Sequence, residues 1–165
     1  MIFFAYGIIK SWQDLNAFEI IRHPWFISAF FAGGFAQLIK LAIGYFRSRA
    51  RDADAGPGGM PSAHTSLVTA LAVAVGLTDG FDSPEAMIAV GFATITMADA
   101  ISIRRAAGEH AALLNRIVAR LDKQERFEAK RLRERLGHRR REVVAGILLG
   151  IAVALVVCGF WDFWK

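Results

Sequence analysis

The chain has 165 residues, 55% of them hydrophobic, and carries a net charge of +5. This length is typical of a single domain, expected here over residues 1–165. The one cysteine, Cys158, excludes a disulfide within the chain and any cysteine cluster for metal or redox chemistry. Long apolar runs alternate with basic blocks, a pattern that favours a membrane protein over a nucleic-acid-binding protein.

The apolar runs predict an all-α, membrane-embedded helical bundle. Residues 1–22 are apolar but repeatedly interrupted by polar side chains, which is typical of a helix lying at the membrane interface. A span needs about 20 mostly apolar residues. We therefore expect about four membrane helices, at residues 24–46, 64–78, 83–103 and 142–164. The second is short for a span, so we expect it to pack inside the bundle.

Local signals support two of these helices. In the first, Gly33-Gly34 would let a neighbouring helix approach closely. The third begins with Ser83-Pro84-Glu85, which places a capping serine, a proline at the first helical position and an acidic residue in the first turn.

Residues 106–141 are strongly basic, with apolar residues at helical spacing near their start. This pattern predicts a basic amphipathic helix on an anionic membrane face. A nucleic-acid-binding arm fits less well, because no groove-reading fold or interleaving of basic and aromatic residues accompanies it. The loop at residues 79–85 is acidic, so the positive-inside rule places the basic segments in the cytoplasm and both ends of the four-helix core outside. We expect an integral protein of the bacterial inner membrane.

On this topology, ionisable residues gather at the cytoplasmic ends of the helices. They are Lys40, Arg47, His64, Asp99, Arg104, Arg105, His138 and Glu142. Each has an ordinary interpretation: Lys40 snorkels to the interface, Asp99 forms an ion pair with a nearby arginine, and His138 begins a helix. Their convergence on one face favours a functional site, since ionisable residues within spans are costly.

This set of residues suits phosphoryl transfer. Cationic side chains hold a phosphate and stabilise its charge, and a histidine can attack phosphorus to form a phosphohistidine. Glu142 follows His138 by one helical turn and can orient its imidazole. His64, in the first turn after Ser62, can protonate the leaving alkoxide. No metal is required; the alternative is Mg²⁺ held by Asp99 and Glu142.

These residues also carry a family resemblance. Lys40-x6-Arg47, Pro61-Ser62-Ala63-His64 and His138-x3-Glu142 resemble the three-part signature of the type-2 phosphatidic acid phosphatases, relatives of the bacterial acid phosphatases and vanadium-dependent haloperoxidases. The divergent branch of that superfamily is the closer match, through residues 59–66, 99–100, 104–108, 113–115, 136–138 and 142–146. The resemblance covers most of residues 35–155.

The resemblance implies a metal-independent phosphomonoesterase. By this likeness His138 is the nucleophile, Glu142 orients it, His64 is the general acid, and Lys40 and Arg47 bind phosphate. Ser62 in the second motif is a further candidate for phosphate binding, and its ordinary interpretation is a helix N-cap. The chain departs from the main family at Ser48, Ala63, Glu142 and Leu132, the last standing where the family has an arginine. Arg104 or Arg105, or alternatively Arg131 or Arg133, would then supply the missing charge.

The sequence therefore predicts a membrane lipid phosphatase that acts on a phosphomonoester of the phosphatidylglycerophosphate or phosphatidate class at the cytoplasmic face. We expect no cofactor and no nucleic-acid partner, and self-association stays open. One alternative is a phosphatase for polyprenyl phosphates or diphosphates, which would need the opposite topology. Another is a non-catalytic membrane protein that binds anionic lipid or a partner. A transporter fits less well, because no internal repeat is visible.

Overall fold

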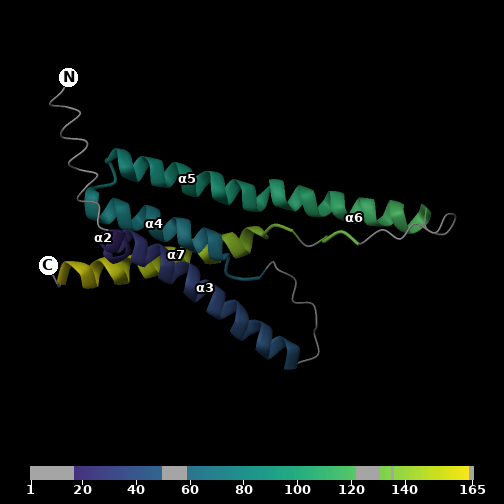
Figure 1. Cartoon of the computed structure of the whole chain (residues 1–165), viewed down its shortest axis with the longest axis horizontal. Coiled ribbons are helices and arrows are strands. Elements are labelled where there is room, and N and C mark those ends of the chain that lie inside the picture. Colours follow the sequence, from purple (N-terminus) through teal and green to yellow (C-terminus); the bar gives the residue numbers. More distant parts are fainter. Residues whose placement is uncertain (1–16, 50–58, 122–130, 135, 164–165) are drawn as a thin grey trace, which may run out of the picture.

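The computed structural model describes residues 17–49, 59–121, 131–134 and 136–163, with the side chains of residues 17–18, 47–49 and 121 excepted. Its elements are α2 (Ala17–Arg22), α3 (Pro24–Arg49), α4 (Ala63–Asp79), α5 (Pro84–Ile101), α6 (Ile103–Leu121) and α7 (Arg140–Phe163). These described parts contain helices and no strand (Figure 1). The predicted all-α class is confirmed.

Three stretches of helix are long and apolar enough to cross a membrane: Pro24–Phe46, Pro84–Arg120 and Arg140–Phe163. Helix α4 is also apolar but has 17 residues. At 1.5 Å per residue it spans about 26 Å, less than the roughly 30 Å of a bilayer core. The described chain thus has three helices suited to spanning a membrane and one shorter apolar helix. The protein is an all-α membrane protein.

Helix α4 lies at the centre of the bundle and packs against α3, α5 and α7 (Figure 1). Its closest neighbour is α7, where glycines let the two backbones meet. A Cβ at Gly150 would lie 2.6 Å from the Ser66 carbonyl oxygen, and one at Gly146 would lie 2.8 Å from that of Ser62. Lipid tails are as apolar as leucine, so small residues that permit close packing hold membrane helices together. The short α4 packs inside the bundle, as its length predicted.

The seam between α4 and α7 continues with small residues toward the other end of the bundle. There α3 joins the two helices in a buried cluster made of Ala32, Ala70, Ala74, Val153, Ala154 and Cys158. The predicted packing role of Gly33-Gly34 holds for Gly33, whose Cα faces the side chain of Leu67, while Gly34 is exposed with open space around it.

Both ends of the loop between α4 and α5 are fixed by side chains. Trp25 Nε1 donates a hydrogen bond of 2.6 Å to Thr78 Oγ1, which ties the start of α3 to the end of α4. Ser83 caps α5 by accepting from the Ala86 N–H, with Pro84 in the first helical position. The predicted start of this helix is therefore confirmed.

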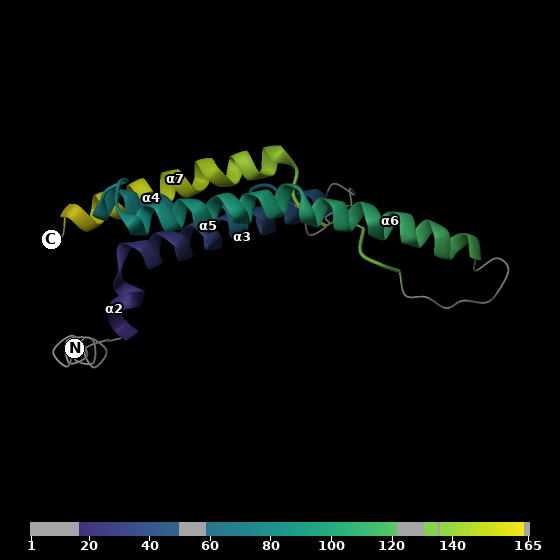
Figure 2. The same cartoon turned by 90° about the horizontal axis from the view of Figure 1, so that it is seen from above.

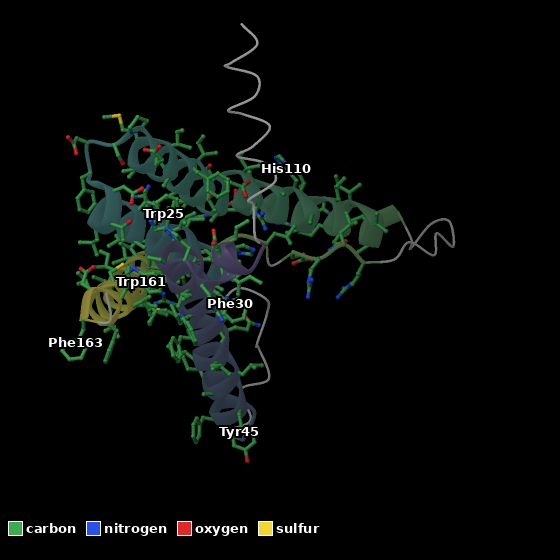
Figure 3. All side chains as sticks on the ribbon, turned by 60° about the vertical axis from the view of Figure 1, so that its left-hand side comes forward. Trp25, Phe30, Tyr45, His110, Trp161 and Phe163 are labelled. Carbon is green, nitrogen blue, oxygen red and sulfur yellow. The ribbon has the colours of Figure 1, made fainter. Side chains whose placement is uncertain are left out.

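Aromatic side chains cover the outer surface of the bundle. Phe30, Tyr45 and Phe163 point away from it in Figure 3, and they are 65%, 60% and 82% exposed. Such large apolar surfaces would be unfavourable in water but suit contact with lipid. The exposed surface is thus consistent with hydrocarbon surroundings.

Helix α6 continues α5 in roughly the same direction and extends beyond the bundle (Figures 1 and 2). Together the two helices have 37 residues from Pro84 to Arg120, or about 55 Å, well over the thickness of a bilayer core. Helix α6 therefore projects past the bundle, and its predicted position on a membrane surface stays a prediction.

The predicted helical segment 106–141 is wrong beyond Leu121 for the described residues. Residues 131–134 and 136–139 are not helical, and they return alongside α6 (Figure 1). One reason is that the Asn115 side chain bonds both the N–H and the carbonyl of Leu132, which are then not available for helical hydrogen bonds. A second is that Gly137 adopts a positive φ of 81°, which is not a helical conformation.

At the other end of the chain, α2 is separated from α3 at His23 and turns away from the α3 axis (Figure 2). Of the interfacial helix predicted over residues 1–22, the six residues of α2 are described. Residues 1–16 lie outside the described part.

Candidate active site

The predicted site residues meet at one end of the bundle. His64, in the first turn of α4, interacts electrostatically with Lys40 of α3, Asp99 of α5, Arg104 of α6 and His138, which precedes α7. Four helices and the approach to α7 therefore contribute side chains to a single region. The ionisable residues that the sequence predicted at one end of the helices are therefore close together in the structure.

The centre of the region is a part-buried imidazole–carboxylate pair. His138 Nδ1 lies 2.9 Å from Glu142 Oε2, and the two side chains are 11% and 13% exposed. The Arg139 N–H donates to the same oxygen over 3.2 Å. A carboxylate only accepts hydrogen bonds, so Nδ1 carries the hydrogen, which in the neutral ring leaves the lone pair on Nε2. The Glu142 carboxylate thus fixes the orientation of the His138 ring.

Backbone contacts hold this pair against the rest of the bundle. The His138 N–H donates to the Ala100 carbonyl at the end of α5 over 2.9 Å. The Ser62 N–H donates to the Glu142 carbonyl over 3.0 Å, which joins the start of α4 to the start of α7. Just before His138, Gly137 has a φ of 81°, and a Cβ there would lie 2.7 Å from the Arg105 nitrogen. The turn into the site therefore requires glycine.

Ser62 is the N-cap of α4 and is fully buried. Its Oγ accepts a hydrogen bond of 2.9 Å from Thr65 Oγ1 and a longer one of 3.4 Å from the Thr65 N–H. The hydroxyl is thus engaged inside the cap, where it stabilises the first turn of the helix. His64 follows in that turn and is exposed. Ser62 therefore fixes the start of the helix that carries His64, and the side chain of His64 itself stays exposed.

Two of the predicted phosphate-binding cations belong to this region. Lys40 is partly buried, its aliphatic stem packs 3.6 Å from the position of a Cβ at Gly59, and it interacts electrostatically with Glu142. Arg104 Nε forms an ion pair of 2.6 Å with Asp99 Oδ2, with the two side chains 57% and 31% exposed. The Arg104 guanidinium is therefore near the site and accessible.

The other two predicted cations are placed differently. Arg105 pairs with Glu109 along the exposed surface of α6, over 3.1 Å. Arg47 lies in the last turn of α3, at the end of that helix that diverges from the bundle in Figure 1. Its side chain is outside the described residues.

Sequence reasoning assigned no role to Asn115, although the residue stood within the family-like motif. In the structure its amide bonds the backbone of Leu132 and a carboxylate oxygen of Glu134, seventeen and nineteen residues further along. Gly108 lies beneath the same segment, where a Cβ would come within 2.5 Å of the Glu134 carbonyl oxygen. The signal in the sequence was an amide side chain on an otherwise apolar and basic helix.

Comparisons with known proteins agree with this arrangement. Residues 21–153 match the Divergent PAP2 family. The chain is 37% identical over 156 residues to "Uncharacterized membrane protein YuiD" of Bacillus subtilis (strain 168), an alignment that covers 87% of this chain and 99% of that protein. No solved structure matches. With helices of the expected type and a match that spans most of its length, the chain belongs to the Divergent PAP2 family.

Proposed function

We propose that this protein is a membrane lipid phosphatase that hydrolyses a phosphomonoester through a phosphohistidine intermediate. The observation that carries the proposal is the part-buried pair of His138 and Glu142, joined over 2.9 Å. A carboxylate on Nδ1 orients the ring and stabilises the positive charge that develops on it, which is what a nucleophilic Nε2 requires.

In the first step, Nε2 of His138 attacks phosphorus and the bond from phosphorus to the lipid oxygen breaks. His64 gives its proton to the departing alkoxide. In the second step, water attacks the phosphohistidine and transfers a proton to His64. The nitrogen–phosphorus bond then breaks, which releases inorganic phosphate and restores both histidines.

Cationic side chains stabilise the phosphoryl group during both steps. Lys40 and Arg104 are the described cations that interact with His64, and we assign phosphate binding to these two. The N-terminus of α4, capped by Ser62, adds the positive end of a helix dipole. These groups supply the charge stabilisation that phosphoryl transfer needs, so the proposed mechanism uses no cofactor.

The substrate we propose is a phospholipid of the phosphatidylglycerophosphate or phosphatidate class, bound at the cytoplasmic face of a bacterial inner membrane. The site lies at the ends of apolar helices, where the headgroup of a membrane lipid would lie. An isoprenoid phosphate carries the same chemical group, so the experiment must include both kinds of lipid.

The test is phosphate release by purified, detergent-solubilised protein from a panel of phosphatidate, phosphatidylglycerophosphate and polyprenyl phosphates. We expect His138→Ala to abolish turnover and Glu142→Gln to reduce it less, because the first removes the nucleophile and the second only its orienting partner. His110→Ala is the matched control, because this histidine is exposed on α6. Vanadate, which imitates five-coordinate phosphorus, should inhibit competitively.

Two outcomes would contradict the proposal. Turnover near the wild-type level in His138→Ala would remove that residue from the mechanism. No phosphate release from any lipid would instead favour the non-catalytic function, binding of anionic lipid. In that case vesicles containing anionic lipid should retain the wild-type protein through its exposed arginines, including Arg131 and Arg133.

A further inference from the structure

The route by which the chain reaches His138 is fixed well outside the site. On α6, Asn115 Nδ2 donates to the Leu132 carbonyl over 2.8 Å, and Asn115 Oδ1 accepts from the Leu132 N–H over 2.9 Å. One side chain thus satisfies both backbone groups of a single residue. Asn115 Nδ2 also lies 2.9 Å from Glu134 Oε1. We call this arrangement the Asn115 clamp.

A second anchor lies at the site itself, where the His138 N–H bonds the Ala100 carbonyl. Leu132 and His138 are only six residues apart along the returning chain. Between them the Leu136 N–H donates to the Glu134 carbonyl over 3.1 Å, and Gly137 has a φ of 81°.

The returning chain is therefore a short link between its two anchors. It also lies close to α6 between them, since a Cβ at Gly108 would come within 2.5 Å of the Glu134 carbonyl oxygen and one at Gly137 within 2.7 Å of the Arg105 nitrogen. A short link that is packed against the helix and held at both ends limits how far either end can move.

We propose that Asn115 is a positioning residue for His138, acting through this short link. The inference rests on the proposed role of His138 as nucleophile. With the clamp present, the chain can place His138 in few positions. Without it, the segment remains attached at the site end only, and the imidazole samples positions from which attack on phosphorus is slower.

Hydrogen exchange and kinetics on the solubilised full-length protein together test the proposal. In Asn115→Ala we expect the Leu132 and His138 amides to exchange about tenfold faster, as befits the loss of one or two hydrogen bonds. We expect kcat to fall about tenfold while KM changes less than about twofold, since positioning acts in the transition state. The control is Arg116→Ala, whose Nε donates to the Ala112 carbonyl of its own helix and whose loss should leave both readouts unchanged.

A second variant avoids any folding defect in α6. One glycine inserted between Leu136 and Gly137 leaves the Asn115 clamp intact but adds about 3.4 Å of slack. It should lower kcat as Asn115→Ala does, while the Leu132 amide stays protected. An unchanged kcat in either variant, or unchanged exchange in Asn115→Ala, would overturn the proposal. Wild-type protein that releases no phosphate would contradict the proposed function instead, and exchange at the His138 amide would then decide alone whether the clamp positions that residue.

Discussion

The contact between α4 and α7 leads to a sharp prediction for Gly150→Ala. The new Cβ would lie 2.6 Å from the Ser66 carbonyl oxygen and 3.0 Å from the Ala70 nitrogen, where ordinary contact begins at 3.4 Å. The difference of 0.8 Å at the closer atom (3.4 minus 2.6) must come from moving α7 away from α4, because both neighbours are backbone atoms. Overpacking of this kind costs about 1–3 kcal/mol.

The matched control is Gly159→Ala on the same helix, where nothing lies within 4 Å of the new Cβ. Both substitutions gain the same helix propensity, about 1 kcal/mol, so the difference between them isolates the packing cost. At about 2–4 °C per kcal/mol, Gly150→Ala should melt about 2–12 °C below Gly159→Ala. Thermal unfolding of the two solubilised variants, followed by circular dichroism, measures this difference. Equal melting temperatures would refute the close backbone contact between α4 and α7.

Two further predictions concern the loop end of α4 and the orientation of the bundle in the membrane. Trp25→Phe removes the hydrogen bond to Thr78 Oγ1, so the free energy of unfolding should fall by about 1 kcal/mol and the melting temperature by about 2–4 °C; an unchanged melting temperature would argue against that bond. In a Cys158→Ser background, a thiol introduced by Asp82→Cys should react with an impermeant maleimide from outside the cell, and one introduced by Arg131→Cys only from the cytoplasm. The reverse pattern would place the candidate site on the outer face.

Features governed by local rules could be predicted from the sequence. Apolar length predicted helices α3, α5 and α7, and the serine and proline at residues 83–84 predicted where α5 begins. The four-residue spacing of His138 and Glu142 predicted their hydrogen bond, although His138 precedes α7 and reaches Glu142 from the turn that enters that helix. Each of these inferences depends on residues close together in the chain.

The returning segment shows where such reasoning ends. Its residues are basic with interspersed leucines, as in an amphipathic helix, yet contacts with α6 decide its conformation. The bonds from Asn115 to Leu132 join residues seventeen apart, and no periodicity reports such a pairing. Ser62 is a similar case: the sequence allowed either a cap or a phosphate ligand, and only the packing of α4 against Glu142 shows that its hydroxyl faces inward.

The last prediction separates cationic from metal-assisted catalysis. The Mg²⁺ alternative needs the carboxylates of Asp99 and Glu142 to be available to a cation. In the structure Asp99 is neutralised by Arg104 over 2.6 Å, and Glu142 Oε2 already receives hydrogen from His138 and from the Arg139 N–H. Binding Mg²⁺ would require breaking these contacts, and the ion would then lie beside Arg104, which repels it.

We therefore expect phosphate release to be unchanged after exhaustive chelation. Asp99→Asn should reduce turnover modestly, because Arg104 loses an exposed ion pair worth less than about 1 kcal/mol and stays free to hold phosphate. If chelation abolishes activity and Mg²⁺ restores it in wild type but not in Asp99→Asn, the phosphohistidine mechanism is wrong. Asp99 is then a metal ligand, and Arg104 must leave it before the reaction begins.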